Sequence, residues 1–133
     1  MWAWEAMEFA RKIGLPISLD VADPFVVQAA RADIEKVLES YASLAFLNEE
    51  EAAALVGGSA ESALNEVPVS TTVVKLGSRG SLVKSKGETF EVGIRPTEAI
   101  DTTGAGDAFV GGFCHGLASG LAETEAGALT IIG

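Results

Sequence analysis

The first half of the chain alternates between apolar residues at helical spacing and short apolar runs. Between residues 24 and 40 the apolar positions recur every three or four residues, which is typical of a helix with one buried face. The run 44–47 (LAFL) has no polar position, which is typical of a strand buried on both faces of a parallel sheet. This half predicts a helix over 3–13, a strand over 16–20, a helix over 24–40, a strand over 44–47, a helix from 49 to the glycines at 57 and 58, and a short helix over 59–66.

Strand patterns dominate the second half as far as residue 92. Residues 71–76 are dense in β-branched side chains and predict the clearest strand of the chain. Two short segments, 81–84 and 88–92, flank a Lys-Gly pair and predict a hairpin. Helical spacing returns over 105–118 and again over 123–132. This alternation predicts an α/β fold in one unit over 1–133, with helices on both faces of the sheet.

Composition and charge narrow the classes of function. The net charge is −10 and there is no long block of Lys and Arg, so nucleic acid is not an expected partner. No apolar run approaches the roughly 20 residues that span a bilayer, so no membrane partner is expected and a cytoplasmic location is predicted. A single cysteine and a single histidine, Cys114 and His115, exclude an intrachain disulfide and a two-histidine metal site.

A glycine-rich stretch, DTTGAGD, leads into the helix predicted from residue 105. Gly104 and Gly106 allow a sharp turn and leave several backbone N–H groups unobstructed at the start of that helix. Those amides, together with the helix dipole, suit an anion such as a phosphoryl group. Asp107 follows them and can orient a hydroxyl group and accept its proton. By local physics alone, an ordinary glycine turn with Asp101 or its neighbour Thr102 as a helix cap fits equally well.

Two common nucleotide motifs do not fit this stretch. The chain contains no G-x-x-x-x-G-K-[ST] sequence, which excludes a Walker-type phosphate loop. Gly104 and Gly106 lack a third glycine, with Phe109 at that position, so the dinucleotide fingerprint is excluded as well. Residues 101–107 instead resemble the DTxGAGD signature of the PfkB (ribokinase-like) carbohydrate kinase family, and they match it at every fixed position.

The resemblance implies a role for each part of the stretch. Asp107 would be the catalytic base, and Gly104, Ala105 and Gly106 would form the anion hole. Asp101 would lie near the substrate and the phosphates, with a less defined role. The implied fold is a three-layer αβα, ribokinase-like (Rossmann-like) sheet. The chain corresponds to the later part of a family member, so it is expected to be the C-terminal nucleotide-binding and catalytic part, without the lid and the N-terminal part.

Two further stretches are similar to motifs of the same family. Asn48 and Glu51 match its N-x-x-E motif after a buried strand, which implies that they organise magnesium through water. The alternative is an ordinary N-cap with an acidic first turn. Lys75, Gly77 and Gly80 resemble the family's strand and glycine loop near the ATP phosphates. The alternative for these glycines is a tight turn into the hairpin.

Together the motifs imply transfer of the γ-phosphate of ATP to a hydroxymethyl group, with Mg²⁺ as cofactor. A monovalent cation is left open as a further cofactor. Residues 17–27 and 45–52 resemble the adenosine-kinase-like branch, which also contains proteins described as sugar kinases. A small sugar is therefore the first expected acceptor, and adenosine or another nucleoside the second. A non-catalytic nucleotide-binding regulatory module and an acidic interaction domain without a ligand are the rival classes. The oligomeric state, and whether this chain alone is active, are not predicted.

Overall fold

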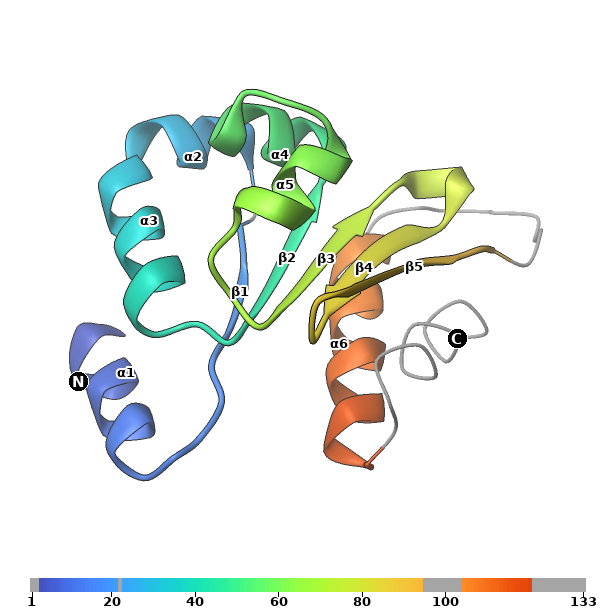
Figure 1. Cartoon of the computed structure of the whole chain (residues 1–133). Helices are drawn as coiled ribbons and strands as arrows, with labels where there is room; N and C mark the ends of the chain where they lie inside the picture. Colours follow the sequence, from blue (N-terminus) through green and yellow to red (C-terminus); the bar gives the residue numbers. More distant parts are fainter. Residues whose placement is uncertain (1–2, 22, 95–103, 121–133) are drawn as a thin grey trace.

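One mixed sheet of five strands organises the molecule (Figure 1). The computed structural model describes residues 3–21, 23–94 and 104–120. The strands lie in the order β1-β2-β3-β4-β5, with β1 to β3 parallel and the last two pairings antiparallel. The elements are α1 (Ala3–Lys12), β1 (Ser18–Asp20), α2 (Pro24–Ala29), α3 (Arg31–Ser40), β2 (Leu44–Asn48), α4 (Glu49–Val56), α5 (Ala60–Glu66), β3 (Thr71–Lys75), the 3₁₀ turn η1 (Gly77–Arg79), β4 (Ser81–Ser85), β5 (Glu88–Val92) and α6 (Ala105–Ala118).

The parallel part of the sheet brings three polar strand ends to one edge. β2 and β3 are buried along four of their five residues, as the apolar runs predict. The register pairs Asp20 with Phe46 and Asn48 with Lys75. Because parallel strands run in the same direction, their carboxyl ends lie at the same edge, which is where ligands bind in open α/β sheets.

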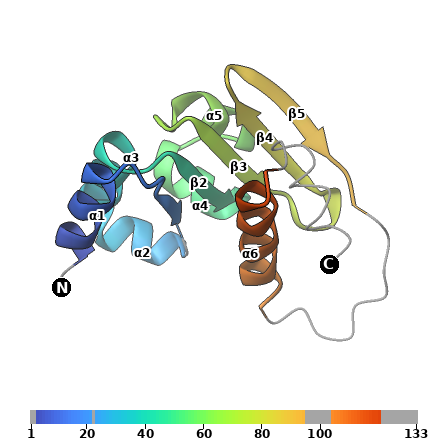
Figure 2. The same cartoon turned by 90° about the horizontal axis from the view of Figure 1, so that it is seen from below.

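Helices cover both faces of this sheet, as the alternating pattern predicts. Figure 2 shows α6 on one side of the sheet and α4 and α5 on the other. The face under α2 to α5 has an aliphatic core that includes Val27, Leu47 and Val74. The face under α6 is aromatic: Phe46 meets Phe113 edge-on, with ring centroids 5.4 Å apart. The architecture is therefore the three-layer αβα arrangement.

The structure corrects one sequence prediction. The helix expected over 24–40 is two helices, because the backbone leaves the helical conformation at Ala30, with φ of −123° and ψ of 27°. Hydrophobic spacing does not register the break, since Val27, Ile34 and Leu38 on its two sides belong to one buried cluster. The helix over 105–118 and the hairpin over 81–92 are confirmed. The helix expected over 123–132 lies outside the described residues.

Candidate active site

The helix α6 begins at a glycine, which has no side chain to cap it. Gly104 is the N-cap residue and has φ of 78°, in the left-handed region that favours glycine. Its carbonyl accepts the first helical hydrogen bond, from the amide of Ala108 at 3.0 Å. Gly104, Ala105, Gly106 and Asp107 are all exposed. Among the described residues no side chain caps this helix, so its first amides can donate hydrogen bonds to an anion from solvent, which the helix dipole favours.

Lys75, the last residue of β3, brings a cation to this helix start. A Cβ atom added to Gly106 would lie 3.7 Å from Lys75 Nζ, which places the ammonium next to the first turn of α6. The Lys75 side chain is only 16% exposed, and its Nζ lies 3.7 Å from Oδ1 of Asp20, at the end of β1. An ammonium and a set of helix amides thus meet at one point of the surface. Both attract a negatively charged group.

Asn48 and Glu51 form a reciprocal cap at the start of α4. Asn48 Oδ1 accepts the Glu51 amide at 2.8 Å, and the Glu51 carboxylate accepts the Asn48 amide at 2.8 Å and its Nδ2 at 3.0 Å. Glu51 is 3% exposed. Burial raises the pKa of the Glu51 carboxyl, opposed by the hydrogen bond from Asn48 and by the charge of Lys75. The charges of Asp20 and Asp23 act in the same direction as burial. Both oxygens of Glu51 are thus engaged within the fold.

The loop between β3 and β4 needs glycine for packing reasons. Gly80 is buried with φ of 91°, and a Cβ atom there would lie 2.0 Å from the carbonyl oxygen of Val92. Its carbonyl also accepts the amide of Leu76 at 2.8 Å. Gly77 has φ of 59°, with open space around it. The tight turn into the hairpin, which the sequence left as an alternative, therefore explains why position 80 needs glycine, and the nucleotide-binding role of Gly80 stays a prediction.

An ion pair ties this loop to the α4 start. The guanidinium of Arg79 contacts the carboxylate of Glu49, and both side chains are largely exposed. The contact raises the pKa of Arg79 through the hydrogen bond and the charge of Glu49. Exposed ion pairs of this kind contribute little to stability. It nevertheless joins the loop carrying Gly77 and Gly80 to the helix that carries Glu51, so the two predicted motifs are neighbours.

The predicted site residues fall into one group with two exceptions. Lys75 lies beside Gly106, and its strand partner Asn48 ends the neighbouring strand. Asp101 lies outside the described residues. Gly80 lies against the backbone of Val92, with no space for a side chain. The sequence reasoning missed Asp20. Its signal was available, because it ends the strand predicted over 16–20 and would share a sheet edge with Asn48 and Lys75 if the strands were parallel.

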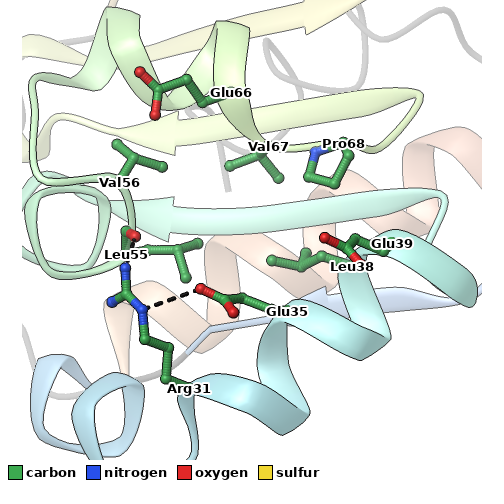
Figure 3. Close-up of a pocket in the computed structure, with 9 residues that line it drawn as sticks. All are labelled: Arg31, Glu35, Leu38, Glu39, Leu55, Val56, Glu66, Val67 and Pro68. Atoms are coloured by element: carbon green, nitrogen blue, oxygen red, sulfur yellow. Dashed lines mark hydrogen bonds and ion pairs between the residues drawn. The ribbon is translucent and has the colours of Figure 1, made fainter.

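Two hollows on the surface of the described residues lie away from Lys75 and the α6 start. Figure 3 shows one of about 420 Å³, bordered by α3 and by the ends of α4 and α5. There the guanidinium of Arg31 donates to the carbonyl of Ala54 at 2.9 Å and pairs with Glu35 at 3.0 Å. It also donates to the carbonyl of Leu55, so the charge caps the end of α4 and is not presented to a ligand. Another hollow, of about 460 Å³, lies at the opposite edge of the sheet, beside Ser18 and Leu117.

The described residues contain neither a metal-binding cluster of acidic, His or Cys side chains nor a membrane-spanning helix. Among the residues that the structure describes, no three His, Cys, Asp or Glu side chains are grouped closely enough to hold a metal ion. No helix within the described ranges has the length and apolar character needed to cross a bilayer. Water and phosphate oxygens are the usual partners of Mg²⁺ in proteins.

Comparison with known proteins identifies the chain's family. The model of the pfkB family of carbohydrate kinases matches residues 3–129. The chain belongs to this family. An uncharacterized sugar kinase from Archaeoglobus fulgidus is 35% identical over 118 residues, which cover 85% of this chain and 46% of that protein. Mouse ribokinase is 34% identical over 126 residues, covering 86% of the chain and 37% of the relative. Yeast (Saccharomyces cerevisiae) adenosine kinase is 30% identical over 129 residues, covering 85% and 38%.

Solved structures of pfkB-type kinases have the same fold. A probable sugar kinase from Rhizobium etli superimposes with a TM-score of 0.89 at 28% identity, covering 96% of this chain and 40% of that chain. An adenosine kinase from Sinorhizobium meliloti gives the same TM-score at 30% identity and the same coverage. The ribokinase-like fold and the likeness to adenosine kinases are thus confirmed. The chain spans less than half the length of these relatives, so it corresponds to one part of a pfkB kinase.

Proposed function

We propose that this chain is the nucleotide-binding and catalytic part of an ATP-dependent kinase that phosphorylates a hydroxymethyl group of a small sugar. The observation that carries the proposal is the meeting of Lys75 Nζ with the open start of α6 at Gly106. Among the described residues, this place combines a half-buried cation with uncapped helix amides and an adjacent carboxylate, Asp107. Membership of the pfkB family, in which the sequence signature has this role, supports it.

The amides of Gly104, Ala105 and Gly106 stabilise the phosphoryl group in transfer. Phosphoryl transfer requires mainly positioning and charge stabilisation, because the three equatorial oxygens carry most of the developing charge. Exposed amides at the positive end of α6 supply that stabilisation without reorganisation. Lys75 adds a point charge to the triphosphate from the neighbouring strand. Gly77 borders the nucleotide from the next loop, and Gly80 gives that loop its shape.

Asn48 and Glu51 fit a magnesium ion held mostly through water. Glu51 is a buried carboxylate whose pKa is raised by burial, so a nearby cation would compensate its charge. Both of its oxygens already accept hydrogen bonds from Asn48, which suits contact with the metal through a water molecule better than direct ligation. Bound Mg²⁺ supplies neutralisation of the phosphate charge. The two side chains would orient its water shell.

Asp107 acts as the base in this reaction. The acceptor hydroxyl oxygen forms a bond to the γ-phosphorus while the bond to the oxygen bridging the β- and γ-phosphates breaks, which releases ADP. The hydroxyl proton passes to the Asp107 carboxylate. Asp107 is exposed in the first turn of α6, one residue after Gly106, so the base and the anion-binding amides share one rigid helix. A base fixed relative to the phosphoryl site contributes through orientation as well as proton transfer.

A nucleoside acceptor is the second candidate. It is favoured by the likeness to an adenosine kinase at 30% identity, both in sequence and in a solved structure. The two sugar-kinase likenesses favour a sugar. An acceptor screen with ribose and adenosine as the first two compounds separates the candidates, because each is converted to a monophosphate that chromatography resolves.

Replacing the base tests the proposal directly. In the full-length protein, Asp107→Asn should lower turnover about 10³-fold, because a positioned base contributes roughly 10²- to 10⁴-fold. Affinity for Mg·ATP should stay within a factor of about three, since the amides and Lys75 are unchanged. Transfer of labelled γ-phosphate measures the first quantity, and calorimetric titration the second.

The outcomes separate the rival classes. Undiminished transfer by Asp107→Asn rules out its role as the base. Nucleotide binding without transfer by the parent, for any acceptor, points to a regulatory module. Absence of nucleotide binding by the folded, full-length parent removes the kinase proposal altogether and leaves an interaction domain.

A further inference from the structure

The ammonium of Lys75 lies where the adjacent helix disfavours a cation. The position of a Gly106 Cβ atom would be 3.7 Å from Lys75 Nζ, in the first turn of α6. The partial charge at a helix N-terminus is positive, so it repels an ammonium. With the side chain only 16% exposed, water screens this repulsion weakly. A negative group must therefore hold Lys75 in place.

Besides Asp107 on α6 itself, Glu51, Asp23 and Asp20 lie near this edge of the sheet, and among the described residues only Asp20 forms an ion pair with Lys75. Glu51 is committed to Asn48 through both of its oxygens. Asp23 Oδ1 accepts the amide of Phe25 at 2.7 Å and so caps α2. Asp20 Oδ1 lies 3.7 Å from Lys75 Nζ. Asp20 is thus the group that offsets the helix dipole.

The length of this ion pair matters for what Lys75 can do. Charge-assisted hydrogen bonds between nitrogen and oxygen are about 2.7–2.9 Å long. At 3.7 Å, Asp20 attracts the ammonium without accepting a proton from it in a hydrogen bond. The 3.7 Å contact with Asp20 therefore does not occupy an N–H group of Lys75 in a hydrogen bond.

We propose that Asp20 is a positioning residue that holds the Lys75 ammonium beside Gly106, where the ammonium can donate hydrogen bonds to an anionic oxygen of a phosphate. Asp20 acts through Lys75 and does not itself touch the phosphate. The identity of the anion rests on the function proposed above. The placement of Lys75 by Asp20 does not, so it can be tested without a nucleotide.

The test is a double-mutant cycle with a charge-matched control. The variants are Asp20→Asn, Lys75→Met, the two combined, Asp20→Glu and Asp23→Asn. Asp23→Asn removes the same charge from the same edge of the sheet and keeps the cap, because Asn caps helices as well as Asp does. Two quantities are measured on each: the amide chemical shifts of the ¹⁵N-labelled chain without nucleotide, and the dissociation constant of Mg·ATP for the full-length protein.

The proposal predicts coupling through Lys75. Asp20→Asn should shift the Gly106 amide resonance and weaken Mg·ATP binding about tenfold, the size of one displaced charge contact (about 1.4 kcal/mol). In the Lys75→Met background, Asp20→Asn should leave the Gly106 amide resonance in place. It should change the dissociation constant of Mg·ATP by less than a factor of about two. Asp20→Glu should restore affinity to within about threefold of the parent, and Asp23→Asn should leave both readouts at the parent's values.

Two results would overturn the inference. One is an effect of Asp20→Asn that persists at full size in the Lys75→Met background, because Asp20 would then act directly. The other is a Gly106 resonance that does not respond to Asp20→Asn while Lys75 is present. If neither the parent nor any variant binds Mg·ATP, the proposed kinase function is refuted. The chemical shifts alone then still decide the role of Asp20.

Discussion

Two helices start at this edge of the sheet, and they begin in opposite ways. At α4 the Asn48 side chain and the buried Glu51 carboxylate form hydrogen bonds with each other and with the backbone amides of Asn48 and Glu51. Acidic residues fill the first turn. At α6 the N-cap is Gly104 in the left-handed region, and the residues after it are exposed. Near it lies the cation of Lys75. The first start is closed by its own side chains, whereas the second is open to a ligand.

The difference shows how a chain separates stability from binding within one fold. A capped helix start has fewer free donors to offer, and its negative first turn repels an anion. An uncapped start gives up that stabilisation, roughly 1 kcal/mol, and retains its donors. Three changes test whether this contrast between α4 and α6 is real, because each should affect one start and not the other.

Removal of the α4 cap should have the largest effect. Asn48→Ala loses the acceptor for the Glu51 amide and the Nδ2 donor to the buried Glu51 carboxylate. Loss of an N-cap costs about 1 kcal/mol, and a buried acceptor left unpaired costs about 1–3 kcal/mol, so we expect a loss of about 2–3 kcal/mol. Urea denaturation measures it. Asn48→Ser retains a cap but not the Nδ2 donor, so its stability should lie between those of the parent and Asn48→Ala. Equal stability of parent and Ala variant would show that α4 is not closed as described.

Blocking the α6 start should change binding more than stability. The Cβ of a residue at 106 fits at 3.7 Å from Lys75 Nζ, but the additional methyl groups of Gly106→Val would project into the anion site. We expect a loss of Mg·ATP affinity of tenfold or more, with a stability change within about 1 kcal/mol. Gly106→Ala is the matched control, with affinity within threefold and a slightly more stable helix. Calorimetric titration and thermal unfolding measure these quantities. Undiminished binding by the Val variant would argue that the amides of α6 do not hold the nucleotide.

The smallest effect concerns the charge buried at the α4 start. Because burial raises the folded-state pKa of Glu51, the folded protein retains this proton at a pH where the unfolded chain has lost it. Stability from this group is therefore fully present below the unfolded pKa and is lost as the pH rises through the folded pKa. Glu51→Gln removes that dependence and keeps a capping side chain.

The measurement is the unfolding free energy against pH, in EDTA to exclude metal. As the pH rises from about 4 through the raised pKa, the unfolding free energy of Glu51→Gln should increase relative to that of the parent. Above that pKa the difference should become constant. Parallel curves for the two proteins across the whole range would contradict a raised pKa.

Much of the fold follows from local patterns in the sequence. The cap at Asn48, the buried strand before it and the hairpin around Lys86 are all set by neighbouring residues, and all are confirmed. The break at Ala30 is not predictable from spacing, because buried side chains continue in phase across it. The need for glycine at position 80 depends on a carbonyl of β5, which only the folded hairpin brings close.

The candidate site was predictable in part. The resemblance of residues 101–107 to a family signature located the α6 start, and membership of the family is confirmed. The roles of Asp107, Asn48 and Glu51 remain predictions. The place of Asp20 at this sheet edge was predictable from the strand it ends. Its pairing with Lys75 was not, since the pairing depends on strand register and on which face each side chain takes.

The strand order has a consequence for how the molecule forms. Each strand pairs with the strand that immediately precedes it in the chain, so the sheet can grow in the order of synthesis, one edge at a time. Pairing between consecutive strands also keeps the sequence separation of contacting residues smaller than pairing between distant strands would. The helix α6 packs against Phe46 and Val73, which belong to strands that precede it in the chain. Among the described elements, the helix that carries Gly106 and Asp107 is therefore the last to be made, and the candidate site forms only once these five strands have been made.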